Sequence, residues 1–366
     1  CCAAKHHGER ERALDSGAVR RGGWGGSLKK NKIRGSLTLV VDCARHARAA
    51  AAMDRFVART LRPPAELHGA QPTVVELFAG AGGMSLGLQQ AGYAHVALVE
   101  RTRHCVETLR RNGFKHVLHC DAHLVDYTLY RGADLVAGGP PCQPYSIGGF
   151  SHGAADPRDG WAVAVRAVRE VQPRAFLFEN VTGLMRTRFA GYIGGIVREL
   201  EDLGYKVRLC RANAADYGVP QRRRRVFFVG TRRGLRYHRP RKAPRVVTLR
   251  EAIRDLGPPN GRNGHDAHTA DARTYRGHVP SSLDAPCKCL TAGTKGNSGG
   301  AGLVILDDGT QRYLTIRELA RVQSFPDTYV FCKVWYHAWN ELGAACPPLL
   351  ARRFAEGLPR PPPPSS

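Results

Sequence analysis

Short apolar runs alternate with amphipathic stretches along most of this chain from Thr73 onward. Each run has the length and composition of a buried strand. The runs are TVVELF (73–78), HVALVE (95–100), DLVAGG (134–139), RAFLFEN (174–180) and RVFFVG (225–230). Patterns typical of helices lie between them, for example at 161–171 and 192–204. Buried strands that alternate with helices predict an α/β fold with a Rossmann-like, doubly wound and mostly parallel sheet.

The same pattern divides the chain into regions. Residues 1–70 are basic, glycine-rich and without a clear period, so we expect a disordered N-terminal extension. The strand and helix pattern fills 71–230, and 231–300 is rich in Gly, Pro and His, which predicts a small irregular domain. Helical patterns return within 301–358, and 359–366 is a Pro- and Ser-rich tail that we expect to be disordered.

Charge changes the expected class of partner. The chain has 366 residues and a formal net charge of +24, which favours polyanions such as nucleic acid. A GC-rich genome, which encodes arginine often, is the alternative explanation of this charge. We expect no membrane partner, because no apolar run is long enough to span a bilayer, and we see no signal peptide at the start.

Cysteine usage indicates the compartment. The 11 cysteines are odd in number and scattered, which favours a reducing, intracellular location, either a bacterial cytoplasm or a eukaryotic nucleus. The segments CKC (287–289) and HDAH (265–268) do not have the spacing of common zinc modules, so we expect no metal. We expect four histidines at the surface around the first half of the sheet: His104, His116, His119 and His123.

The first candidate site is a glycine turn. The segment ELFAGAGGMSLGL (76–88) predicts a strand, a turn and the start of a helix, where glycines let the backbone approach a ligand. Glu100 ends the next strand, at a place where an acid can accept hydrogen bonds from ribose hydroxyls. The two features predict a nucleotide-binding half of the fold, although many other α/β turns are also rich in glycine.

The second candidate site is a thiol on a stiff turn. The segment DLVAGGPPCQPYS (134–146) places Cys142 behind two prolines at the end of a strand, where ligands of such sheets collect. A rigid support suits a nucleophile, whereas a free cysteine is otherwise a small buried hydrophobe. Glu179, which ends another apolar strand, favours the catalytic reading, because a buried acid is costly without a partner or a role. In a dry pocket its neutral form could donate a proton.

Four consecutive arginines enter the last predicted strand. Because side chains alternate along a strand, Arg223 and Arg225 lie on one face and Arg222 and Arg224 on the other. We expect one pair to serve a site and the other to be solvated.

Taken in order, these motifs resemble those of the DNA (cytosine-5)-methyltransferase family. The resemblance rests on FAGAGG, GGPPCQPYS, ENV, QRRRRVFFVG and RELARVQSFPDTY, and it runs from about Val74 to Leu358. It implies a class I methyltransferase fold with S-adenosylmethionine as cofactor, double-stranded DNA as partner and a monomer. It places the catalytic and cofactor-binding domain at 71–230 and 301–358, and a short target-recognition region at 231–300. It also implies methyl transfer to carbon 5 of cytosine through a covalent cysteine adduct on a flipped base, as in restriction–modification enzymes.

The resemblance also implies a role for individual residues. The cofactor would be held by Phe78, Gly80, Ala81, Gly82, Gly83, Glu100, Asp121, Pro141 and Trp161. Of these, Phe78 would stack on the adenine, Glu100 would hold the ribose and Asp121 the adenine amino group. The catalytic residues would be Cys142, Glu179, Arg225 and Arg223. DNA would be contacted by Gln143, Ser146, Asn180 and Gln221.

The catalytic residues divide the work on the cytosine ring, as the resemblance implies. Cys142 would be the nucleophile, and Glu179 would contact the ring nitrogen and the amino group of the cytosine. Arg225 would bind the carbonyl oxygen of the base, and Arg223 would support the catalytic loop and a phosphate.

The chain also departs from the family's pattern. Ala344 stands where the family usually has asparagine, Cys346 where it has valine and Cys289 where it has threonine, and the recognition region is short. An amide lost near the cofactor weakens binding by roughly 1–3 kcal/mol. Two alternatives therefore stay open: a tRNA cytosine-5 methyltransferase, whose Cys-Phe-Thr signature we do not find, and a catalytically weakened DNA-binding homologue.

Overall fold

The structure, a computed structural model, describes residues 71–141, 159–262, 264–266, 279–292 and 301–361. The N-terminal extension and most of the tail expected from the sequence lie outside the described residues. So do three predicted site residues: Cys142, Gln143 and Ser146. In the part that is described, no helix is long and apolar enough to cross a membrane.

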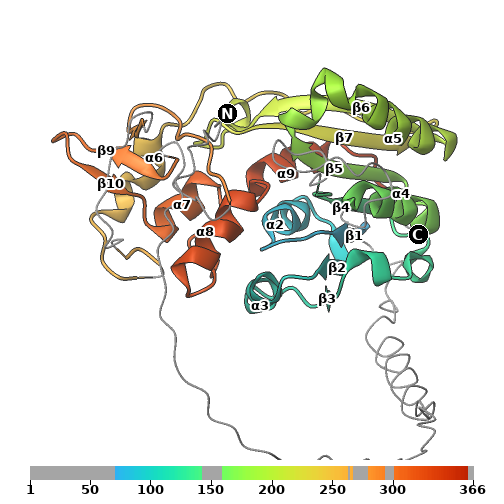
Figure 1. Ribbon diagram of the computed structural model, residues 1–366, viewed down its shortest axis with the longest axis horizontal. Helices are drawn as coiled ribbons and strands as arrows, with labels where there is room; N and C mark the ends of the chain where they lie inside the picture. Colours follow the sequence, from blue (N-terminus) through green and yellow to red (C-terminus); the bar gives the residue numbers. More distant parts are fainter. Residues whose placement is uncertain (1–70, 142–158, 263, 267–278, 293–300, 362–366) are drawn as a thin grey trace, which may run out of the picture. The chain divides into compact units, whose positions relative to one another are not determined.

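A seven-stranded sheet forms the centre of the fold (Figure 1). In spatial order its strands are β3 (Val117–His119), β2 (Ala94–Glu100), β1 (Thr73–Leu77), β4 (Leu135–Gly138), β5 (Ala175–Val181), β7 (Arg224–Arg232) and β6 (Tyr205–Asn213). Neighbouring strands are parallel, except that β7 runs antiparallel to both β5 and β6. The predicted mostly parallel α/β sheet is thereby confirmed.

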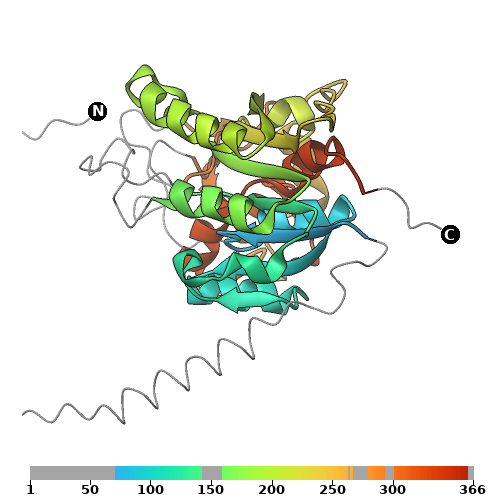
Figure 2. The ribbon, with the colours of Figure 1, turned by 90° about the vertical axis from the view of Figure 1, so that its right-hand side faces the viewer.

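Helices cover both faces of the sheet (Figure 1), and Figure 2 looks onto the face covered by the two green helices. This covering explains why the strands read as continuous apolar runs. The covering helices are α4 (Gly160–Val171) and α5 (Ala190–Asp202) on one face, and α2 (Gly83–Gln90) and α9 (Pro348–Glu356) on the other. All five residues of β1 are buried: Val75 packs in the cluster with α4 and α5, and Val74 in the cluster with α2 and α9. Successive side chains of the strand thus pack against helices on opposite faces of the sheet, as expected of a doubly wound fold.

A third apolar cluster joins the remaining helices to a small sheet. The helices are α3 (Arg103–Arg111), α6 (Leu249–Ile253), α7 (Ile316–Val322) and α8 (Trp335–Ala344). The small sheet consists of β8 (Ser281–Ser282), β9 (Leu303–Ile305) and β10 (Gln311–Tyr313). Its strands come from both sides of residue 300, where the sequence pattern placed a domain boundary.

The fold positions a site where β1 and β4 lie side by side. The chain winds outward from β1 through β2 to β3, and in the opposite direction from β4 through β5. In such sheets, ligands bind beyond the carboxyl ends of the strands at this change of direction. The glycine turn that follows β1 and the Gly-Pro turn that follows β4 both lie at this edge.

Candidate active site

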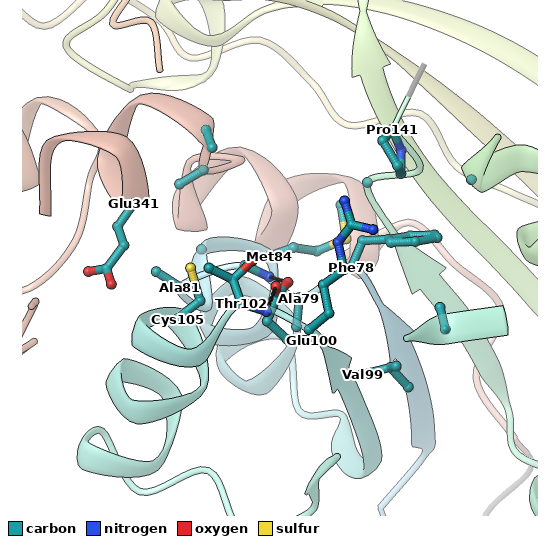
Figure 3. Close-up of a pocket in the computed structure, with 18 of the residues that line it drawn as sticks. Phe78, Ala79, Ala81, Met84, Val99, Glu100, Thr102, Cys105, Pro141 and Glu341 are labelled. Carbon is teal, nitrogen blue, oxygen red and sulfur yellow. Dashed lines mark hydrogen bonds between the residues drawn. The ribbon is translucent and has the colours of Figure 1, made fainter. Parts of the chain in front are cut away.

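A cavity of about 460 Å³ opens beyond the carboxyl ends of β1, β2, β4 and β5 (Figure 3). Such a volume is within the range of small-molecule sites, roughly 300–1,000 Å³. Except for Gly82 and Trp161, every residue predicted to hold the cofactor lines it: Phe78, Gly80, Ala81, Gly83, Glu100, Asp121 and Pro141. Glu179 lines the same cavity.

The β1–α2 turn exposes its backbone to this cavity. Phe78 and Gly80 both have a φ of 55°, in the left-handed region that an aromatic residue rarely adopts. A methyl group built on Gly80 would meet no atom of the described residues within 4 Å, so the backbone there is open to a ligand. Strained aromatic backbone of this kind costs about 1–3 kcal/mol and is typical of ligand sites.

Gly82 and Gly83 serve close packing more than ligand approach. A Cβ at Gly82 would overlap the hydroxyl of Tyr329, and one at Gly83 would overlap the carbonyl oxygen of Cys346. The Tyr329 hydroxyl also donates a 2.6 Å hydrogen bond to the carbonyl of Ala81. These two glycines therefore let α2 and the turn lie against the C-terminal segments.

The carboxylate of Glu100 closes the turn. Its Oε2 accepts a 2.8 Å hydrogen bond from the Gly80 amide, and its Oε1 accepts one of 2.7 Å from the Thr102 amide. Because each carboxylate oxygen has two lone pairs, both oxygens can accept another hydrogen bond. Glu100 can thus order the turn and still receive ribose hydroxyls, and that contact remains a prediction.

Asp121 offers an ionised carboxylate at the cavity wall. Its Oδ1 accepts hydrogen bonds from the backbone amide of His123 at 3.0 Å and from the imidazole of the same residue at 2.9 Å. These bonds, the backbone one most of all, lower the pKa of Asp121, and Arg101 lowers it further from 3.6 Å. Such a group is acceptor-only, which suits the predicted contact with an adenine amino group.

Glu179, near the end of β5, and Arg225, at the start of the antiparallel β7, form an ion pair. Nε of Arg225 lies 2.6 Å from Oε1 of Glu179, and each side chain is only 11% exposed. The contact departs from hydrogen-bond geometry, so among the described residues this buried Oε1 accepts no well-directed hydrogen bond. The sequence predicted an acid with a partner or a role, and the structure supplies a cation that offsets the cost of burial.

Arg223 is a buried brace. Its guanidinium donates hydrogen bonds to the carbonyls of Leu290 at 2.7 Å and Gly343 at 2.9 Å, and the residue is 1% exposed. Burial, followed by the nearby charge of Arg225, lowers the pKa of Arg223 to about 10. These contacts join Arg223 to Leu290 and Gly343, whereas the catalytic loop it was predicted to support lies outside the described residues, so that role stays a prediction. A phosphate contact does not fit this geometry, because the guanidinium is buried.

The predicted alternation of the four arginines is present in the structure. Arg222 and Arg224 are exposed, Arg223 is buried and Arg225 is partly buried.

Two residues expected to contact DNA are buried instead. Asn180 donates a 2.8 Å hydrogen bond to the carbonyl of Pro140, and its own amide oxygen accepts from the Val181 amide. Gln221 is fully buried and bonds the side chain of Gln323 and the amide of Leu290. Both side chains hold neighbouring loops in place, and the structure does not present either amide to a DNA surface.

Trp161 also departs from its expected place. It is fully buried in the core between α4 and the sheet, with its ring centroid 4.4 Å from that of Phe228. The tryptophan is not part of the cavity lining, whereas Gly160 beside it is. Its predicted contact with the cofactor has no support from this geometry.

The whole described core matches one known family. The sequence profile of the C-5 cytosine-specific DNA methylases matches residues 72–360. The chain belongs to this family. Relatives include the type II methyltransferase M.AplI of Arthrospira platensis, 34% identical over 299 residues that cover 79% of this chain and 86% of that protein. The type II methyltransferase M.NgoMIV of Neisseria gonorrhoeae is 34% identical over 302 residues, which cover 77% and 95% of the two chains.

Solved structures support the fold of this methylase. The Dnmt2 methyltransferase of S. pombe has a TM-score of 0.63 at 19% identity and covers 78% of this chain and 98% of its own. The methyltransferase EhMeth of Entamoeba histolytica also has a TM-score of 0.63, at 16% identity, with 77% and 96% covered. At these identities the likeness concerns the class I methyltransferase fold alone. S-adenosylmethionine is the methyl donor of the C-5 methylase family.

The methylase cavity contains side chains that the sequence patterns did not assign to a site. His104, Cys105 and Glu341 line it, from α3 and α8. His104, which was expected at the surface around this half of the sheet, is 24% exposed there and pairs with Glu341 at 2.9 Å. One feature of the sequence could have indicated these residues: Glu341 is an acid among apolar residues in the helix WYHAWNELGA.

Proposed function

We propose that this protein transfers a methyl group from S-adenosylmethionine to carbon 5 of cytosine in double-stranded DNA. One observation carries the proposal: Glu179, held by Arg225, lines the same cavity as Phe78, Gly80 and Glu100. A group suited to a pyrimidine ring and groups suited to a nucleoside cofactor therefore line one space. Membership of the C-5 methylase family supports the same reaction.

The residues around the cavity fit the cofactor. The backbone at Gly80 is open, Glu100 has lone pairs left for ribose hydroxyls, and Asp121 is an ionised acceptor for an amino group. The side chain of Phe78, which lines the cavity beside them, offers an aromatic face for a purine. When bound, S-adenosylmethionine supplies an electrophilic methyl group.

The chain's own residues would activate the cytosine. In the proposed mechanism the thiolate of Cys142 adds to carbon 6 of the ring, and Glu179 gives ring nitrogen N3 a proton or a hydrogen bond. Arg225 holds the carbonyl oxygen of the base. Carbon 5 becomes nucleophilic and is methylated, a base removes its proton, and the thiolate leaves from carbon 6. Cys142 lies outside the described residues, and its role rests on the sequence motif.

The target atom is inaccessible inside a duplex, so we propose that the base is flipped out of the helix. The relatives M.AplI and M.NgoMIV are type II methyltransferases. As part of the proposal, this chain acts as a monomer in the modification half of a restriction–modification pair. Its excess of 55 Lys and Arg over 31 Asp and Glu would provide the contacts to phosphates.

A labelling experiment tests the reaction. The protein is incubated with methyl-labelled S-adenosylmethionine and either duplex DNA or tRNA, and the labelled DNA is then sequenced after bisulfite treatment. We expect label on DNA only, at 5-methylcytosine in a recurring sequence. Label on tRNA alone would favour the RNA-methylating alternative. A folded protein that labels neither would favour the weakened homologue, for which Ala344 at the cavity is the specific observation.

A further inference from the structure

Three metal-ligating side chains converge at one end of the cavity, apart from the residues assigned to the methyl-transfer reaction. They are His104 and Cys105 on α3 and Glu341 on α8, and their ligand atoms all lie within 4.8 Å of one another. The Nδ1 atom of His104 is 2.9 Å from Oε1 of Glu341 and 3.6 Å from Sγ of Cys105. Figure 3 shows Glu341 and Cys105 at the same end of the cavity, on their separate helices.

The carboxylate of Glu341 is buried without a fixed cation. Its side chain is fully buried, and among the described residues its one ion-pair partner is His104, which is charged only when protonated. The other groups that bond it are neutral: the Thr108 hydroxyl at 3.0 Å and the Cys332 amide at 3.1 Å. An ionised carboxylate is costly to bury without a compensating positive charge, so this position favours a cation.

The thiol of Cys105 lies beside the same acid. The residue is buried, and its Sγ atom is 3.6 Å from Nδ1 of His104, which in turn pairs with Glu341. A cysteine sulfur is a ligand of divalent cations in its thiolate form, so this thiol adds a third ligand atom at the same place.

We propose that His104, Cys105 and Glu341 bind one thiophilic divalent cation of the zinc class. Imidazole nitrogen, thiolate sulfur and carboxylate oxygen are together the ligand set that zinc prefers, and the N–S separation of 3.6 Å suits two ligands on one such ion. The ring of His337 stacks on that of His104, with the two centroids 4.3 Å apart. Binding forms a sulfur–metal bond and releases the proton of Cys105 to solvent.

The cation would connect two elements that build the cofactor cavity. α3 follows the strand that ends at Glu100, and α8 ends at Ala344, which also lines the cavity. A bond from each helix to one ion would fix their separation and stabilise the folded protein in proportion to the binding free energy. The inference does not depend on the identity of the methyl acceptor.

Cobalt provides the direct test, because a thiolate ligand gives Co²⁺ a characteristic charge-transfer absorption. The metal-free full-length protein is titrated with Co²⁺ and then with Zn²⁺, alongside the variants Cys105→Ser and His104→Gln. Cys120→Ser is the matched control, since Cys120 is a partly buried thiol that lines the same cavity outside the cluster. Thermal unfolding without metal shows that each variant is folded.

We expect one Co²⁺ site with a thiolate absorption that Zn²⁺ abolishes. Cys105→Ser should remove this absorption, His104→Gln should weaken binding by at least about tenfold, and Cys120→Ser should change neither. The proposal is overturned if folded Cys105→Ser keeps the absorption and affinity of the unchanged protein. It is equally overturned if the unchanged protein shows no thiolate absorption, in which case the cluster is a hydrogen-bond network that joins α3 to α8.

Discussion

At the scale of single residues, the site depends on charged groups that the fold buries in pairs or against backbone carbonyls. The Glu179 carboxylate is stabilised by the Arg225 guanidinium, whose Nε lies 2.6 Å from Oε1. Arg223 instead donates hydrogen bonds to the carbonyls of Leu290 and Gly343. Glu179 lines the cavity, whereas Arg223 is buried and is not part of the cavity lining. Substitutions at the two positions should therefore separate catalysis from stability.

Glu179→Gln removes the proposed proton donor but keeps the size of the side chain. We expect kcat to fall by about 10²–10⁴-fold, because a positioned acid contributes that much to proton transfer. The measurement is steady-state methyl transfer to duplex DNA, with Glu107→Gln on the exposed side of α3 as control. A Glu179→Gln enzyme with unchanged kcat would remove this residue from the mechanism.

Arg223→Ala leaves two buried carbonyls without their donor. We expect the free energy of unfolding to drop by about 2–5 kcal/mol. The matched change Arg224→Ala, at the exposed neighbour, should stay within about 0.5 kcal/mol of the original protein. Chemical denaturation of both variants measures the difference, and equal stabilities would contradict the brace.

Ala344→Asn restores the amide that the family usually has at this position of the cavity wall. If the alanine costs one or two hydrogen bonds to the cofactor, the variant should bind S-adenosylmethionine more tightly by roughly 1–3 kcal/mol, or about 5- to 150-fold. Calorimetric titration of both proteins gives the two affinities. Unchanged affinity would mean that other groups in this cavity already satisfy the cofactor.

The residues of the site were only partly predictable from the sequence. Motif order was enough to place Glu100, Asp121 and Glu179 around one cavity, because strand ends meet at one edge of a parallel sheet. Whether a polar residue faces the cavity or the interior depends on which loops, far away in the sequence, pack against it. Gln221, which resembles an exposed polar residue in the sequence, is for this reason buried against Gln323, and Asn180 is buried in a similar way by its bond to the earlier loop at Pro140.

At the scale of elements, the close approach of α2 to the C-terminal segments determines how the glycine turn is held. Gly83 lies against the carbonyl of Cys346, and Tyr329 bonds the carbonyl of Ala81. The turn is therefore stabilised by residues far away in the sequence, and its shape should be sensitive to any added atom on α2.

Gly83→Ala should disturb this contact. We expect a loss of about 1–3 kcal/mol in the free energy of unfolding, since the added methyl overlaps backbone that cannot easily move. Gly195→Ala is the control, because Gly195 is inside α5 and a methyl there meets nothing within 4 Å. That change should instead stabilise the helix by about 0.5–1 kcal/mol. Two variants of equal stability would contradict the packing described here.

The elements differ in how well the sequence predicts them. Strands β1, β2, β4, β5 and β7 are buried and apolar, so their runs were recognisable from hydrophobicity alone. Strand β6 was missed because it lies at the edge of the sheet and alternates basic with apolar residues in YKVRLCRAN. The two- and three-residue strands of the small sheet are too short to show any period.

At the scale of the whole molecule, the net charge of +24 should dominate affinity for DNA. Neutralised phosphates release counterions, and affinity then falls steeply with salt. We expect binding to duplex DNA to weaken by about 10³–10⁵-fold between 50 and 200 mM salt, if about 6–10 phosphates are contacted. Fluorescence anisotropy at several salt concentrations measures the slope. A flat dependence would show that the excess of arginine does not serve phosphate binding.

The central claim is that Cys142 bonds transiently to a cytosine during methyl transfer. Duplex DNA that carries 5-fluorocytosine at the target site tests it most directly, because fluorine blocks the release of the base after methylation. With S-adenosylmethionine present, we expect a protein–DNA adduct that survives denaturing electrophoresis, and no adduct with Cys142→Ser. An adduct that persists in the Cys142→Ser variant would contradict the account. So would the absence of an adduct with an unchanged protein that methylates ordinary DNA.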